Sequence, residues 1–327
     1  MLTYDLKVGY SCNNRCKHCV IDDSKDMLLN KAVSIDLTTN ECMEQIDEML
    51  KKKITSIVLT GGEVTIRKDF SELIKKCVDS NLLITVQTNG RKLNDVKIIN
   101  AIKDVKNIKF VIALHGKSAK THDAITQVRG SFIETCQGIK KMCLLGKNVI
   151  LKIVISKINM LELPEIIKLA SNLGVKYICF AFPHGHGAAR KNFSKIIPTY
   201  SELKEILREM INIATQEKIN IEFEAIPFCI IPYAMQLVGE LKYLEGNTMC
   251  TQVREDTFDW EKVRKSIKRK GNNCIKCDMD NFCEGPWSEY IETFGTDELI
   301  PIRLPIKSKE LIYKALNKKN LKIKEVN

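Results

Sequence analysis

The chain has 327 residues, of which 44% are hydrophobic and 28% charged, and its 51 basic and 40 acidic side chains leave a net charge of +11. This composition excludes an intrinsically disordered protein, and the length suffices for about two domains. The N-terminus lacks a secretory signal and no apolar run is long enough to span a membrane. We therefore expect a cytoplasmic protein whose 13 cysteines are reduced.

Six short apolar, β-branched runs alternate with segments of helical spacing over the first two thirds of the chain. Alternating strands and helices predict a parallel sheet, and six units are too few for a closed eight-unit barrel. The sequence therefore predicts an α/β fold built on a partial (β/α)6 TIM-like barrel, with its chemistry at the carboxyl ends of the strands. The expected strands are 6–9, 54–60, 82–88, 108–114, 149–156 and 175–182.

Several helix starts carry recognisable signals. Thr38 with Glu41 and Asp69 with Glu72 have the spacing of a capping box, in which each side chain satisfies the other residue's backbone N–H. Pro164 stands where a first-turn proline is tolerated. We expect helices to begin at these three places.

The regular pattern ends near Ile221. Residues 222–300 hold three prolines, five cysteines and both tryptophans, which predicts a small irregular domain held by metal rather than by a core. We divide the chain into a barrel (1–221), this small domain (222–300) and a basic helix or tail (301–327). The lysines after Leu304 suit a solvated helix, and nucleic acid is not favoured as their partner because the tail has one aromatic residue.

Three cysteines, Cys12, Cys16 and Cys19, lie within eight residues in the loop after the first expected strand. Three thiolates satisfy three irons of a four-iron cluster and leave one iron without a protein ligand. A structural zinc site is the alternative, but it needs four ligands. His18 would have to supply the fourth while its neighbour Cys19 points the same way.

This loop resembles the C-x3-C-x2-C motif of the radical S-adenosylmethionine (SAM) superfamily, including a ring residue, His18, before the last cysteine. Two further segments lie in the expected order. The segment 61–65, Gly-Gly-Glu-Val-Thr, is similar to the family's GGEPT segment with Val64 in place of proline, and Thr88-Asn89-Gly90 ends the next strand.

The resemblance implies a mechanism in which SAM binds the open iron, one electron splits its carbon–sulfur bond, and a 5′-deoxyadenosyl radical takes hydrogen from a substrate. Glu63 would accept from the SAM amino group. Arg129 would replace an arginine that the family has where this chain has Thr126, and the alternative for Ser156 is a strand-end cap. The cofactor-binding residues implied are His18, Gly61, Gly62, Glu63, Thr65, Asn89, Arg129 and Ser156.

A second group of cysteines has the spacing C-x2-C-x5-C, at Cys274, Cys277 and Cys283. It is similar to the core of SPASM domains, although Trp287 stands where those domains have a further cysteine. With Cys250 as fourth ligand, the group would hold one auxiliary four-iron cluster, as in the shortened twitch domains. A zinc ion is the alternative.

Two more cysteines and two histidines are candidates for the cavity. Cys179 or Cys229 would return a hydrogen atom to a substrate radical, the alternative being core packing. His184 and His186 fall in a glycine-rich loop after the sixth strand, as acid or base groups or as ordinary loop residues.

The sequence thus indicates a radical SAM oxidoreductase or maturase that acts on a ribosomally synthesised peptide and receives electrons from a flavodoxin or ferredoxin. The peptide is an inference by analogy. A dehydrogenase or cyclase of a small molecule is the alternative enzyme. A non-catalytic zinc or iron–sulfur module that binds nucleic acid is the alternative of another class, but it gives no reason for the three-cysteine loop and segment 61–65.

Overall fold

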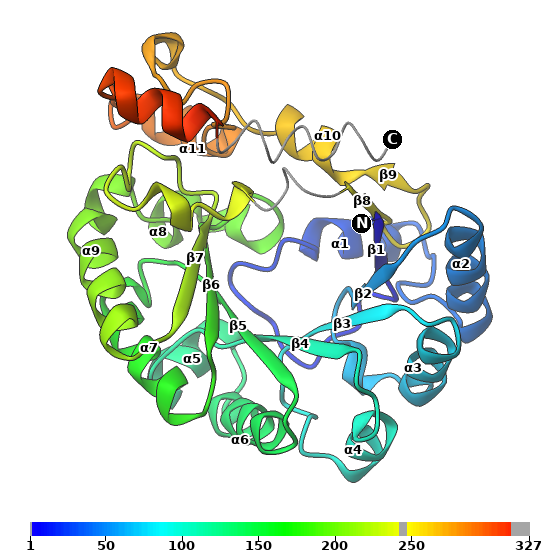
Figure 1. Ribbon diagram of the computed structural model, residues 1–327. Helices are drawn as coiled ribbons and strands as arrows, with labels where there is room; N and C mark the ends of the chain where they lie inside the picture. The colour runs from blue at the N-terminus through cyan, green and yellow to red at the C-terminus, as the bar shows by residue number, and fades with distance from the viewer. Residues whose placement is uncertain (1, 242–246, 315–327) are drawn as a thin grey trace.

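A computed structural model describes residues 2–241 and 247–314. Within them the strands form one curved sheet that stays open between its two edges (Figure 1). The strand order is β7-β6-β5-β4-β3-β2-β1-β8-β9, and only the β8–β9 pair is antiparallel. The strands are β1 (Leu2–Lys7), β2 (Ser56–Thr60), β3 (Leu83–Thr88), β4 (Ile108–Ala113), β5 (Asn148–Val154), β6 (Tyr177–Ala181), β7 (Asn220–Glu224), β8 (Asn247–Cys250) and β9 (Phe258–Asp259).

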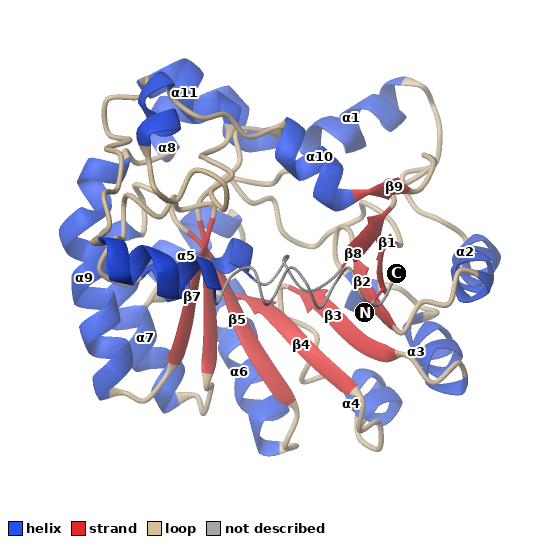
Figure 2. Ribbon diagram, turned by 45° about the horizontal axis from the view of Figure 1, so that its top comes forward, coloured by secondary structure: helices blue, strands red, loops and turns tan. Residues whose placement is uncertain are grey.

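Helices cover the outer face of this sheet, as Figure 2 shows for α2, α3, α4, α6, α7 and α9. No helix in the described parts of the chain is both long and apolar enough to cross a membrane. The α-helices are α1 (Asp22–Asn30), α2 (Thr39–Lys51), α3 (Phe70–Asp79), α4 (Val96–Ile102), α5 (Ala119–Thr126), α6 (Ser131–Leu144), α7 (Leu163–Asn172), α8 (Phe193–Ile196), α9 (Tyr200–Gln216), α10 (Trp260–Ser266) and α11 (Ser288–Phe294), and residues 306–314 are also helical.

The expected α/β fold with an open, partial barrel is confirmed. All six expected strands are present, the first beginning earlier, at Leu2. A seventh parallel strand, β7, was not predicted. Its apolar Ile221 and Phe223 alternate with Glu222 and Glu224, but a strand of five residues shows too few repeats of this period-two pattern to stand out in the sequence.

Strand β7 crosses the expected boundary at residue 221, and β8, from the expected small domain, extends the barrel sheet by pairing in parallel with β1. The irregular part therefore begins after β7 and is joined to the sheet again through β8. Of the expected basic tail 301–327, residues 315–327 lie outside the described residues.

The core lies between the sheet and its outer helices. Fully buried side chains such as Leu59, Phe110 and Leu151 come from the strands, and each contributes about 1.5–3 kcal/mol by leaving water. The three expected helix starts, at Thr38, Asp69 and Pro164, are confirmed, and Thr38 with Glu41 forms the expected capping box. The Asp69 box is wrong: its carboxylate accepts from Arg67 and Thr39 instead.

Candidate functional site

The loop with Cys12, Cys16 and Cys19 leaves β1 and is tied down at both ends. Ser11 donates from its backbone and hydroxyl to the Asp36 carboxylate, and backbone N–H groups of Arg15 and Lys17 donate to carbonyls at the end of α5. The thiols are free and partly buried. Burial raises the pKa of the Cys12 thiol to about 11, and the neighbouring thiols add to the same effect at Cys16. Three neighbouring thiols that form no disulfide fit an iron–sulfur cluster.

Two residues after β3 hold this loop from the other side. The Asn89 side chain donates to Asn13 Oδ1 at 2.6 Å, and the Arg91 guanidinium donates to the Asn13 carbonyl at 2.5 Å and to Asn14 Oδ1 at 2.9 Å. Arg91 also pairs with Glu134 at 2.6 Å. Arg91 was missed from sequence, although its place directly after Gly90 was the available signal.

Gly61 and Gly62 permit a close backbone contact with the chain that leads to Cys12. Gly61 has φ +131°, and a Cβ there would lie 2.1 Å from the Gly9 carbonyl oxygen. A Cβ on Gly62 would lie 2.2 Å from the Ser11 carbonyl oxygen. No other residue fits at either position, because these contacts leave no room for a side chain.

Glu63 is buried and joins the segment 61–65 to the end of β3. Its Oε1 accepts from the Thr65 backbone at 3.0 Å, the Thr65 hydroxyl at 2.5 Å and the Thr88 hydroxyl at 2.6 Å, and its Oε2 accepts from the Asn89 backbone at 2.6 Å. Each carboxylate oxygen carries two lone pairs, and Oε2 accepts only the Asn89 bond among these four, so one position on Oε2 remains for a further donor. Thr65 therefore donates two of the four hydrogen bonds that hold the Glu63 carboxylate.

The other expected cofactor contacts fall in different surroundings. His18 is buried against His115, with ring centroids 4.5 Å apart, and burial together with His122 lowers its pKa to about 4. Ser156 donates from its backbone and hydroxyl to Asn159, as a strand-end cap does. Arg129 is exposed in the turn between α5 and α6.

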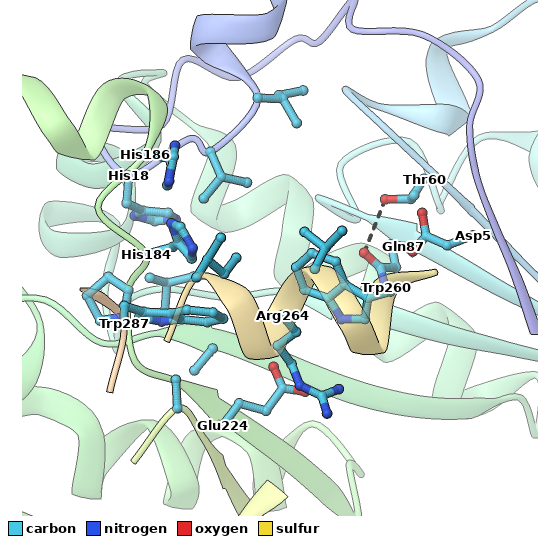
Figure 3. Close-up of a pocket in the computed structure, with 18 of the residues that line it drawn as sticks. Asp5, His18, Thr60, Gln87, His184, His186, Glu224, Trp260, Arg264 and Trp287 are labelled. Carbon is cyan, nitrogen blue, oxygen red and sulfur yellow. Dashed lines mark hydrogen bonds between the residues drawn. The ribbon is translucent and has the colours of Figure 1, made fainter. Parts of the chain in front are cut away.

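A cavity of about 630 Å³ lies between the cysteine loop and the irregular part of the chain (Figure 3). His18 and Gly61 line it on the loop side, while Trp260 and Arg264 of α10 and Trp287 line it on the opposite side. The Trp287 indole donates to the Phe182 carbonyl at 3.3 Å, which fixes this wall to the end of β6. The cavity is therefore bounded by the cysteine loop on one side and by the irregular part of the chain on the other.

In the irregular part, four cysteines face one small apolar cavity: Cys229, Cys274, Cys277 and Cys283. Burial raises the pKa of Cys229 to about 12, and the other three thiols contribute, which places all four within electrostatic reach. Four convergent thiols form a complete ligand set for a four-iron cluster or for zinc.

The expectation that Cys250 completes this set is corrected by the structure. Cys250 lies at the end of β8, paired in register with Asp5 of β1, and its charged neighbours are Asp5, Lys7 and Asp259. Cys229 takes its place, because the chain after β7 turns back over the C-x2-C-x5-C segment. Cys229, expected as a possible hydrogen donor, thus lines the small cavity with the other three thiols and does not line the large one.

The other expected hydrogen donor, Cys179, is buried in β6 beside Glu222 of β7. Its thiol lies within 4.8 Å of carboxylate oxygens of Glu222 and Glu224. Glu224 lines the large cavity, whereas Cys179 is not among the residues that line it.

Comparison with known proteins decides the family. The Radical SAM superfamily model matches residues 6–170, which include the cysteine loop and the segments 61–65 and 88–90. The chain belongs to the radical SAM superfamily. Its cofactors are accordingly a [4Fe–4S] cluster and SAM, and it is an enzyme.

Individual relatives differ in how much of this radical SAM enzyme they match. It is 24% identical to an AdoMet-dependent heme synthase of Methanosarcina barkeri, over 87% of this chain and 90% of that protein. It is 28% identical to the mycofactocin maturase MftC of Mycobacterium tuberculosis over 53% of this chain, and the match spans 42% of the maturase. SuiB of Streptococcus suis bound to S-adenosylmethionine has a TM-score of 0.65 at 15% identity, over 92% of this chain and 76% of SuiB, and shows the same fold.

Replacing Glu63 with alanine is expected to weaken SAM binding by the radical SAM enzyme and to leave its iron content unchanged. The change strands the buried N–H groups of Thr65 and Asn89, which costs about 1–3 kcal/mol for each group. Equilibrium dialysis with SAM and chemical denaturation measure the two effects. Glu72→Ala, on the exposed face of α3, is the matched control. SAM affinity equal to that of the wild type would remove Glu63 from the cofactor site.

Proposed function

We propose that this radical SAM enzyme is a maturase that takes a hydrogen atom from a ribosomally synthesised peptide bound in the 630 Å³ cavity. The cluster and SAM, when bound, supply the reductive carbon–sulfur cleavage that makes this chemistry available. The side chains of the protein bind and orient the reacting groups and shield them from water.

In this proposal Cys12, Cys16 and Cys19 hold the SAM-binding cluster. The segments 61–65 and 88–90 shape the SAM site beside it, since Glu63 connects them and retains one free acceptor position on Oε2. Arg91 and Asn89 fix the loop from the far side. His18 closes the cavity wall next to the cluster and, being held neutral by burial, adds no charge there.

The charges of the cavity support a peptide more than a polyanionic substrate. Its acidic residues are Asp5, Asp23, Glu224 and Glu240, and its basic ones are Lys7, Lys152 and Arg264. Most of these are paired, as Lys7 is with Asp5 at 2.9 Å and Lys152 with Glu224. The cavity is thus nearly neutral although the chain carries +11, and a neutral cavity gives no electrostatic preference to polycarboxylates.

The observation that carries the proposal is the likeness to SuiB in complex with its precursor peptide SuiA, which extends over 91% of this chain with a TM-score of 0.65. The likeness includes the region beyond residue 221, where the family model no longer matches. This supports a cavity that admits a peptide between the two cysteine-bearing regions.

For the auxiliary site we propose one four-iron cluster on Cys229, Cys274, Cys277 and Cys283. Four thiolates saturate its irons, so a substrate cannot bind the cluster directly, and its part is to pass electrons and to brace the irregular region. A cytoplasmic flavodoxin or ferredoxin would supply the electron that the SAM-binding cluster needs.

A small-molecule substrate is the second candidate, favoured by the heme synthase match that covers both chains almost fully. The two candidates are separated by supplying deuterated substrates to the reconstituted enzyme with SAM and dithionite. The test compares a peptide encoded beside this gene with iron porphyrin carboxylates. Deuterium in 5′-deoxyadenosine from the peptide alone is the expected result. Transfer from the porphyrin and none from the peptide would replace the proposal by the second candidate.

A further inference from the structure

Two histidines that line the large cavity meet a glutamate beside it. His184 and His186 lie in the loop after β6, and Glu289 lies in the first turn of α11, more than 100 residues later. The His186 Nε2 atom is 2.7 Å from Glu289 Oε1, and His184 Nδ1 is 3.8 Å from the same oxygen. One ligand atom from each residue lies within 4.8 Å of the other two.

Two polar atoms of this group are buried without a hydrogen-bond partner among the described residues: His184 Nδ1 and Glu289 Oε2. Buried polar atoms are rarely left unpaired, because each costs about 1–3 kcal/mol. Neutral imidazole is the form that binds metals.

We propose that His184, His186 and Glu289 bind one divalent first-row metal ion, for which zinc serves as the representative. Imidazole nitrogens and a carboxylate oxygen suit zinc, and a His₂Glu set leaves a coordination position open. A tetrahedral zinc ion holds its ligand atoms about 3.3–3.6 Å apart, given metal–ligand distances of about 2.0–2.2 Å. In the structure the three ligand atoms lie between 2.7 Å and 4.8 Å from one another, on either side of that spacing. Side-chain movements alone would therefore bring them to the distances that zinc requires.

The backbone around these ligands is fixed. Gly187 has φ +59°, and a Cβ there would lie 2.1 Å from the carbonyl oxygen of Cys19. The Gly187 N–H donates to Asp23 at 2.9 Å, and the Ala188 N–H donates to the Cys19 carbonyl at 2.9 Å. The histidine loop is thereby tied to the loop of the SAM-binding cluster, and a metal ion held there would have a fixed position relative to it.

The open coordination position would face the substrate cavity. Both histidines line that cavity, and Figure 3 shows His184 beside Trp287, with their ring centroids 4.2 Å apart. Trp287 shields the site on one side, and Lys268 Nζ lies over the Trp287 ring, 4.8 Å from its centroid. The ion would therefore present a water molecule, or take a carboxylate or carbonyl oxygen of the substrate in its place.

The test counts metal in the reconstituted holoenzyme. Protein loaded with iron and sulfide is equilibrated anaerobically with a small excess of zinc sulfate and desalted, and zinc and iron are measured by mass spectrometry. The variants are His186→Ala, whose side chain is half-exposed, and the isosteric Glu289→Gln. Glu292→Gln, one turn further along α11 and paired with Arg269, is the matched control.

We expect about one zinc per chain in the wild type and in Glu292→Gln, with iron unchanged, and a loss of affinity of more than about tenfold in the other two variants, because even outer partners of metal ligands are worth 10–100-fold. Unchanged iron in every variant shows that the fold is intact. Absence of bound zinc in the wild type, zinc retained by both ligand variants, or zinc taken up as iron is lost would each overturn the proposal.

Discussion

Replacing Cys12, Cys16 and Cys19 together with alanine is expected to halve the iron content after anaerobic reconstitution, from about eight irons per chain to about four. The loop loses every thiol that holds its cluster, while the four thiols of the irregular region are untouched. The same variant should release no 5′-deoxyadenosine from SAM, because only the loop leaves an iron open. Iron analysis and chromatography of the products measure both effects.

A matched control is Cys143→Ala, which removes a partly buried thiol from α6 and should keep all of the iron. Its side chain packs against the hydrophobic core, and burial raises the pKa of its thiol. If the triple variant also retained about eight irons, the loop would not be a cluster site.

The second large effect concerns the auxiliary thiols. Cys229→Ala is expected to lose about four irons, because it removes one of four ligands that share a cavity with no spare donor of the same kind. Cys250→Ala should keep them, because Cys250 lies in β8 against Asp5. The two variants are matched controls for each other, because each removes one buried thiol, and burial raises the pKa of both thiols to about 12.

Iron content and 5′-deoxyadenosine are measured on both variants. Cys229→Ala should still cleave some SAM at the intact loop cluster while forming no product. The reverse outcome, with iron lost from Cys250→Ala and kept by Cys229→Ala, would restore the ligand set expected from the sequence.

The sequence was sufficient where function depends on short contiguous motifs. The loop from Cys12 to Cys19 and the segments 61–65 and 88–90 follow successive parallel strands, so strand order alone brings them together. The partial barrel was also predictable, because the alternation of strands and helices along the chain indicates a parallel sheet. Spacing also identified the C-x2-C-x5-C segment.

The sequence was insufficient where the residues of one site come from distant parts of the chain. The choice between Cys229 and Cys250 depends on how the residues after β7 turn back, and neither cysteine carries a local signal. Glu289 joins His184 and His186 only because α11 packs against the loop after β6. The four hydrogen bonds accepted by Glu63 likewise follow from the packing of two strand ends.

The measurement that tests the central claim most directly is the release of 5′-deoxyadenosine and methionine by the reconstituted wild type given SAM and dithionite. The cysteine loop with its open iron, the backbone fit of Gly61 and Gly62, and the remaining acceptor position of Glu63 together predict that both products form in equal amounts. They should be absent without dithionite and absent from the Cys12/Cys16/Cys19 triple variant. Intact SAM in the wild-type reaction, with the loop cluster present and reduced, would contradict the account.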